Sequence, residues 1–269
     1  MKSSSLHDGR LWHLAVFSFI LAALTGAALR FGLLLGFPWG WQFVNVRHAH
    51  SHLMFFGWVT PALMMLIIRW LPALTGRPFT AGDQRRQHRL LITIFCLALA
   101  AFATFLWFGY APVPVLGVRL PLATLFAAGN MIAWYRFAFL YRRWTHGISR
   151  QGRRMRPLRL WDAALWFMGI ATLGVWGVAL FSLINVRDPL WMALSTHLFL
   201  DLFAEGWFVL AVLGFIYLFQ PQAAEKWAQR GENWLVMGLP VARFPEIVDN
   251  LEKMAKPIAM LAKSRGGQA

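Results

Sequence analysis

The chain has 269 residues, of which 58% are hydrophobic and 14% are charged. A soluble domain has about 25% charged residues, and here the apolar residues form long uninterrupted runs. These features exclude an ordinary water-soluble domain and predict an all-α polytopic membrane protein. The formal net charge of +15 is then expected to follow the membrane topology, so we expect no nucleic-acid binding.

Six apolar segments approach or exceed the length of about 20 residues that a helix needs to cross the hydrocarbon core. They cover approximately residues 11–30, 50–71, 90–109, 116–140, 161–184 and 191–219. The sequence therefore predicts a transmembrane domain of six helices over residues 1–219.

Arginine is concentrated in alternate loops between these segments. The loop over residues 77–89 contains four arginines and the loop over 142–159 contains seven, whereas the intervening loops contain only Arg47, Arg119 and Arg187. Because positive charge marks the cytoplasmic side, we expect both termini to be cytoplasmic. The location predicted is a bacterial inner membrane, with membrane lipid as the surrounding partner.

The chain becomes polar after Phe219 and contains four further prolines. We expect residues 220–269 to form a cytoplasmic tail with two amphipathic helices at the membrane surface. The first would surround Trp227 and Trp234, and the second would cover residues 247–260.

Three of the eight histidines cluster at the predicted outer start of the second segment. A helix places His48 and His52 on one face and turns His50 about 200° away from either neighbour. One face can therefore present two imidazoles. The alternative is that these histidines merely contact lipid headgroups.

The sixth segment carries His197, Asp201 and Glu205 at every fourth position, separated by apolar residues. An ionised side chain at the bilayer centre costs about 2.5–3.5 kcal/mol on insertion scales. Two carboxylates on one stripe therefore require compensation by a metal ion, a raised pKa, a water-filled proton path or an arginine such as Arg136. A lone intramembrane histidine, in contrast, commonly hydrogen-bonds a neighbouring helix.

The predicted topology makes the second and sixth segments enter the membrane from the same, outer side. A rise of about 1.5 Å per residue puts His197 roughly 10 Å below the outer boundary, and His52 at a comparable or shallower depth. We therefore expect the two histidines to share an outer layer, with Asp201 and Glu205 leading inward.

The residues His-Ala-His-Ser-His-Leu-Met-Phe-Phe-Gly-Trp-Val at 48–59 resemble the second transmembrane helix of the haem-copper oxidase superfamily. In that family a histidine near the outer surface ligates the low-spin haem. The resemblance implies that His52, or else His50 or His48, is an axial ligand of haem b. Arg47 and Arg30 would pair with the haem propionates through charge-assisted hydrogen bonds.

The stripe on the sixth segment resembles the sixth helix of the nitric oxide reductase large subunit, where a histidine and a glutamate serve a non-haem iron. The resemblance implies that His197 and Asp201 bind non-haem iron or copper, with His52 and His48 as further candidate ligands. Asp201 and Glu205 would be the catalytic groups that move protons. Asp201 stands where the family has glutamate, which shortens the reach by one methylene.

The chain resembles only the first six helices of such a subunit, since the remaining histidine ligands of the family have no counterpart after Phe219. A second membrane subunit or a second copy is expected to supply them, and cytochrome c or a quinol is the expected electron donor. The leading hypothesis is a haem- and metal-binding component that handles NO, O2 or electrons, with a nitric oxide reductase-like enzyme as its catalytic form. The alternatives are a non-catalytic accessory or NO-response protein, and a proton or cation transporter.

Overall fold

The structure is a computed structural model that describes residues 5–151, 155–184, 186 and 188–220. The two predicted amphipathic helices of the tail lie outside the described residues. The chain divides into two compact units, Met1–Ile148 and Ser149–Ala269. We call them unit 1 and unit 2 and describe each by itself, so the single six-helix domain over residues 1–219 stays a prediction.

Six long helical segments occur among the described residues, one at the position of each predicted segment. In unit 1 they are α1 (Ser5–Leu35), a continuous helix made of α2 (Phe43–His52), η2 (Leu53–Val59) and α3 (Thr60–Thr75), α4 (Ala81–Phe108) and α5 (Leu122–Trp144). In unit 2 they are α6 (Arg156–Leu183) and a continuous helix made of α7 (Pro189–Asp201), η4 (Leu202–Val209) and α8 (Leu210–Phe219). A short 3₁₀-helix, η1 (Pro38–Gly40), follows α1.

Five of these six segments are long and apolar enough to cross a membrane. The exception is α5, whose sequence includes Arg136, Arg142 and Arg143. The prediction of an all-α, multi-pass membrane protein is therefore confirmed, whereas the sixth crossing stays a prediction.

The fourth predicted segment begins too early in the sequence analysis. Residues 113–120 form an antiparallel hairpin of β1 (Val113–Val115) and β2 (Val118–Leu120) in place of helix. Its two central residues, Leu116 and Gly117, have φ values of 49° and 81°, as a tight two-residue hairpin turn requires. The apolar run at 113–120 thus favours strands because valine is β-branched, and α5 starts only after Pro121.

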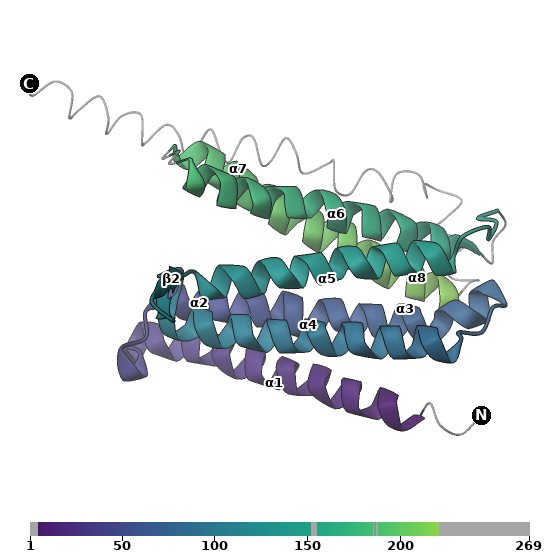
Figure 1. The fold of residues 1–269 in the computed structure, drawn as a ribbon, viewed down its shortest axis with the longest axis horizontal. Coiled ribbons are helices and arrows are strands. Elements are labelled where there is room, and N and C mark those ends of the chain that lie inside the picture. The colour runs from purple at the N-terminus through teal and green to yellow at the C-terminus, as the bar shows by residue number, and fades with distance from the viewer. Residues whose placement is uncertain (1–4, 152–154, 185, 187, 221–269) are drawn as a thin grey trace, which may run out of the picture. The chain divides into compact units, whose positions relative to one another are not determined.

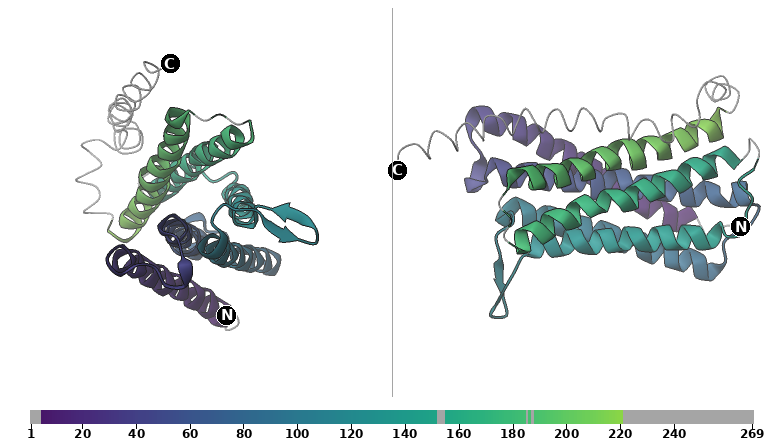
Figure 2. Two further views of the ribbon diagram at one scale, coloured as in Figure 1. Left: turned by 90° about the vertical axis from the view of Figure 1, so that its left-hand side faces the viewer. Right: turned by 90° about the horizontal axis from the view of Figure 1, so that it is seen from above.

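In unit 1, α4 packs against both α5 and the α2–η2 helix, and α1 packs against α2 and η2 (Figure 1). The side-chain amide of Asn130 on α5 donates to the carbonyl of Ile94 on α4 at 3.2 Å. Phe56 of η2 contacts Trp134 of α5 edge to face, with ring centroids 4.6 Å apart. The β1–β2 hairpin projects beyond the helices (Figure 2).

The two ends of unit 1 differ in charge. At one end the Arg77 guanidinium donates to the carbonyl of His146 at 2.8 Å, and the Trp144 indole donates to the Asp83 carboxylate at 3.3 Å. These contacts join the α3–α4 loop to the end of α5, and we call this the basic end; the opposite end, with the hairpin, is the hairpin end. The arginines at the basic end include Arg69, Arg85, Arg86, Arg142 and Arg143. Their gathering at one end agrees with the charge pattern from which we predicted a cytoplasmic face.

The first turn of α4 is closed by a capping box. The Thr80 hydroxyl accepts from the Asp83 N–H at 3.1 Å, and the Asp83 carboxylate accepts from the Thr80 N–H at 3.3 Å. We expect Thr80→Ala to lower the free energy of unfolding by about 1 kcal/mol, because an N–H of the first turn loses its acceptor. Unfolding in mixed detergent measures this loss. Thr93→Ala, on the exposed surface of the same helix, is the control, and equal losses in both variants would contradict the prediction.

In unit 2, α6 packs along α7, η4 and α8. A Cβ added at Gly174 of α6 would meet the backbone of α7 at Ser195 and Phe199. Further along, the Trp161 indole donates to the carbonyl of Ala211 at 3.2 Å. Small residues at the contact therefore let the two helices approach closely, as is common between membrane helices.

Candidate functional site

His48 and His52 face α4 from α2, as their four-residue spacing predicts. The His52 ring stacks on Phe105 with centroids 4.3 Å apart, and it contacts Phe56 edge to face at 4.6 Å. The His48 ring lies 6.0 Å from the same Phe105 ring and 5.0 Å from Tyr110. The predicted shared face is therefore confirmed, and aromatic rings surround it.

The His52 ring has one nitrogen that is out of reach of solvent. Its Nδ1 atom is buried and accepts or donates no hydrogen bond within the described residues. A buried polar atom without a partner costs about 1–3 kcal/mol. The imidazole is therefore held by aromatic packing, and no hydrogen bond from Nδ1 orients it.

His50 points to the opposite side of α2, toward α1, which confirms the predicted turn away from its neighbours. Its Nδ1 atom lies 2.9 Å from the carbonyl oxygen of Ala22. A carbonyl oxygen only accepts, so Nδ1 carries the proton and Nε2 of the neutral ring keeps a free lone pair. Gly26 makes room for the ring, because a Cβ there would lie 2.8 Å from its Cε1 atom.

This geometry matters because metal-ligating histidines almost always donate their other ring N–H to a carbonyl, a carboxylate or water. The bond to Ala22 fixes the tautomer and the orientation of the His50 ring before any metal binds. Within the described residues, no such second partner exists for Nδ1 of His52. Of these two histidines, His50 is therefore the better prepared axial ligand.

Arg30 and Arg47 are both exposed. Arg30 lies near the end of α1, and the Arg47 guanidinium lies 5.7 Å from the centroid of the Phe43 ring. Both arginines thus stand in the neighbourhood of the histidine cluster at the hairpin end. Their role as partners of haem propionates stays a prediction.

In unit 2, His197 and Asp201 lie on the same face of α7. The His197 Nδ1 and Asp201 Oδ2 atoms are 3.6 Å apart, slightly beyond hydrogen-bond distance. Asp201 Oδ2 is buried and has no hydrogen-bond partner within the described residues. The carboxylate is therefore held beside an imidazole with one of its oxygens unsatisfied.

Glu205 lies inside the π-helical segment η4, whereas His197 and Asp201 belong to the α-helix before it. In an α-helix, four residues overshoot a full turn by about 40°. A π-helix has i→i+5 hydrogen bonds and more residues in each turn, so four residues rotate by less and the overshoot is partly cancelled. The sequence analysis assumed α-helical spacing throughout; the π-helical segment favours an even straighter stripe.

The two units repeat one pattern of residues, which the sequence analysis missed. Identical residues recur at a separation of 149 positions in α1 and α6 and again in the helices that follow. The pairs include Arg10-Leu11-Trp12 with Arg159-Leu160-Trp161, His48 with His197, and Gly57-Trp58 with Gly206-Trp207. The two π-helical segments start at Leu53 and Leu202, also 149 positions apart.

The packing repeats with the sequence. A Cβ added at Gly57 would lie 3.4 Å from the Ser18 hydroxyl of α1, and one added at Gly206 would contact Phe167 of α6. Ser18 and Phe167 are themselves separated by 149 positions. Each unit therefore contains an equivalent helix pair, and comparison of the chain with itself would have revealed it.

The repeat makes His48–His52 in unit 1 equivalent to His197–Asp201 in unit 2. In both pairs the two candidate ligands are four residues apart, and the second directly precedes a π-helical segment. Such segments are frequent at functional sites. The described residues contain no group of three or more His, Cys, Asp or Glu residues that could hold a metal ion. Each pair thus supplies only part of a coordination sphere, and a shared layer of His52 and His197 stays a prediction.

No protein-family model, no curated protein and no solved structure matches this chain. The resemblance to the haem-copper oxidase superfamily therefore rests on the residues quoted above.

Proposed function

We propose that the chain is a haem- and metal-binding protein of a bacterial inner membrane. It has six spans with both termini and the tail in the cytoplasm, and it is related to the first half of a nitric oxide reductase or oxidase large subunit. The observation that carries the proposal is the hydrogen bond from His50 Nδ1 to the Ala22 carbonyl, 2.9 Å long. Metal-ligating histidines almost always donate their other ring N–H in this way.

Haem b fits His50 better than His52. The resemblance had implied His52 first, with His50 and His48 as alternatives. The Nδ1 atom of His50 has a carbonyl partner, and a glycine lies opposite the ring. Within the described residues, His52 has neither. Arg30 and Arg47, at the hairpin end, would hold the propionates. When bound, the haem supplies one-electron chemistry and a site for a diatomic gas.

A second metal, iron or copper, fits the histidine and carboxylate of α7. His197 and Asp201 supply one nitrogen and one oxygen ligand, a set that suits iron with open positions. A partner subunit or a second copy of the chain completes the site. Glu205, one turn further along, moves protons, and a cytochrome c or a quinol donates electrons.

A non-catalytic accessory or NO-response protein would use the same ligands. It differs from an enzyme in that metal or haem is bound while neither NO nor O2 is consumed. The ligand geometry supports binding in both cases, so gas consumption by the purified protein separates the two.

A proton or cation transporter is the second candidate, and a specific observation favours it. Asp201 Oδ2 is buried on a long apolar helix and has no hydrogen-bond partner within the described residues. Intramembrane carboxylates commonly mark proton or ion pathways, and internal repeats are frequent in transporters.

An optical spectrum and metal analysis of the purified full-length protein test the proposal. We expect a haem absorption band and about one haem per chain, with iron or copper in addition, because the imidazoles are already oriented. Protein with neither haem nor a stoichiometric metal would contradict both the enzyme and the accessory role. Proton flux in vesicles from such cofactor-free protein would then support the transporter.

A further inference from the structure

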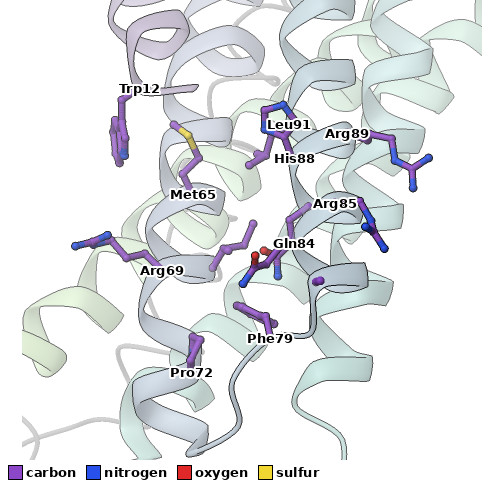
Figure 3. A pocket seen from close by; sticks show the side chains of 13 residues that line it. Trp12, Met65, Arg69, Pro72, Phe79, Gln84, Arg85, His88, Arg89 and Leu91 are labelled. Carbon is purple, nitrogen blue, oxygen red and sulfur yellow. The ribbon is translucent and has the colours of Figure 1, made fainter. Parts of the chain in front are cut away.

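A cavity of about 860 Å³ opens at the basic end of unit 1, the end opposite to the histidine cluster (Figure 3). It lies between α1, α3 and α4, with the α3–α4 loop at its edge. The polar or charged residues that line it are Arg69, Gln84, Arg85, Gln87, His88 and Arg89. Nothing in the proposed function uses this cavity.

The charge at the cavity has one sign. Figure 3 shows Gln84 and His88 between α3 and α4, with Arg69, Arg85 and Arg89 on the outer sides of the two helices. None of the described residues that line the cavity is acidic. The cavity therefore favours an anion, and arginine is the side chain that best matches a phosphate group.

One polar side chain inside the cavity lacks the acceptor that it needs. Gln87 lines the cavity, is only 6% exposed, and its Nε2 atom has no hydrogen-bond partner within the described residues. A buried donor without a partner lowers the stability of the fold. A ligand that brings acceptor oxygens into the cavity would remove this cost.

The rest of the wall is apolar. Trp12 of α1, Met65 and Ile68 of α3 and Leu91 of α4 line it. Tryptophan is enriched where membrane helices reach the headgroup layer. A ligand that touches both parts of the wall must carry an anionic head and an apolar chain.

We propose that this cavity binds the phosphate headgroup of an anionic phospholipid from the leaflet at the basic end. Basic pockets between transmembrane helices on the cytoplasmic side bind such headgroups through their arginines. The phosphate oxygens accept from Gln87 in the cavity, and Arg69 and Arg85 at its two sides supply positive charge. An acyl chain lies along Trp12 and Met65.

Full-length protein freed of lipid in neutral detergent tests this proposal. Phosphatidylglycerol and phosphatidylcholine are titrated separately and bound lipid is counted by native mass spectrometry. We expect phosphatidylglycerol to bind at least about tenfold more tightly, because it has a net negative charge, whereas the choline of phosphatidylcholine cancels the charge of the same phosphate group. The double variant Arg69→Gln/Arg85→Gln loses this preference. The control Arg142→Gln/Arg143→Gln removes the same charge from the basic end outside the cavity. This variant keeps the preference for phosphatidylglycerol.

Gln87→Leu separates ligand binding from a structural role. Without lipid, the variant is expected to be at least as stable as the wild type, because a buried unsatisfied donor is removed; with lipid, it binds phosphatidylglycerol more weakly. A merely structural glutamine would lower the stability when replaced. Equal loss in both double variants, or equal binding of the two lipids, would overturn the proposal. Displacement of the lipid by inorganic phosphate would overturn the lipid as the source and assign the site to a soluble anion.

Discussion

Alanine at position 50 is expected to remove most of the haem from the purified protein. His50 is the histidine whose Nδ1 atom already donates to a backbone carbonyl, at 2.9 Å from the Ala22 oxygen. Loss of the group that accepts the other N–H of a ligating histidine alone costs about 10–100-fold in metal affinity, so loss of the ligand itself should cost at least as much. The haem absorbance per chain measures the effect. His48→Ala, two residues away on the same helix, keeps the haem.

Gly26 offers a second test that leaves the imidazole in place. A Cβ at this position would lie 2.8 Å from the His50 ring, so Gly26→Ala displaces the ring and weakens haem binding by about 10–100-fold. Gly9→Ala on the same helix is the matched control, because a Cβ there meets no atom within 4 Å. Haem that is retained in His50→Ala but lost in His52→Ala would assign the axial position to His52 and contradict our choice.

The sequence predicts the helices of this protein well because its apolar runs are long. The hairpin at residues 113–120 was missed for a physical reason: Val113, Val115, Val118 and Leu120 are as apolar as the helix that follows. Only Leu116 and Gly117, which take positive φ values in the turn, separate the strands. Hydropathy alone does not distinguish an apolar hairpin from the start of a span.

The candidate site could be predicted only in part. Helical spacing correctly placed His48 and His52 on one face and His50 on another, because this depends on α2 alone. The partner of His50 could not be predicted, since the Ala22 carbonyl and Gly26 belong to α1 and meet the ring only through helix packing. The same holds for the buried amide of Gln87.

The π-helical segments lie beyond prediction from composition, since Leu53–Val59 and Leu202–Val209 read as ordinary apolar helix. Their equivalence, however, can be recognised from the sequence. His48 and His197 precede Gly57-Trp58 and Gly206-Trp207 by the same number of residues. The identity of residues at a constant separation is therefore enough to relate the two candidate sites.

Asp201→Asn is expected to decide between metal binding and transport. The change keeps the shape of the side chain but removes the negative charge that lies 3.6 Å from the His197 ring. If the pair binds a metal, the amide is a much poorer ligand, and the iron or copper content per chain should fall at least about tenfold. Metal analysis measures this, and His197→Ala should give the same loss.

The matched control is Asp188→Asn on the same helix. Asp188 caps α7 by accepting from the Leu190 N–H at 2.9 Å, and asparagine caps a helix about as well as aspartate. This variant should therefore keep both the metal and the stability of the wild type. Ligation by Asp201 would be contradicted if Asp201→Asn kept its metal content but lost proton flux in vesicles. The carboxylate stripe from Asp201 to Glu205 would then be a proton path, as the buried and unsatisfied Asp201 Oδ2 atom also allows.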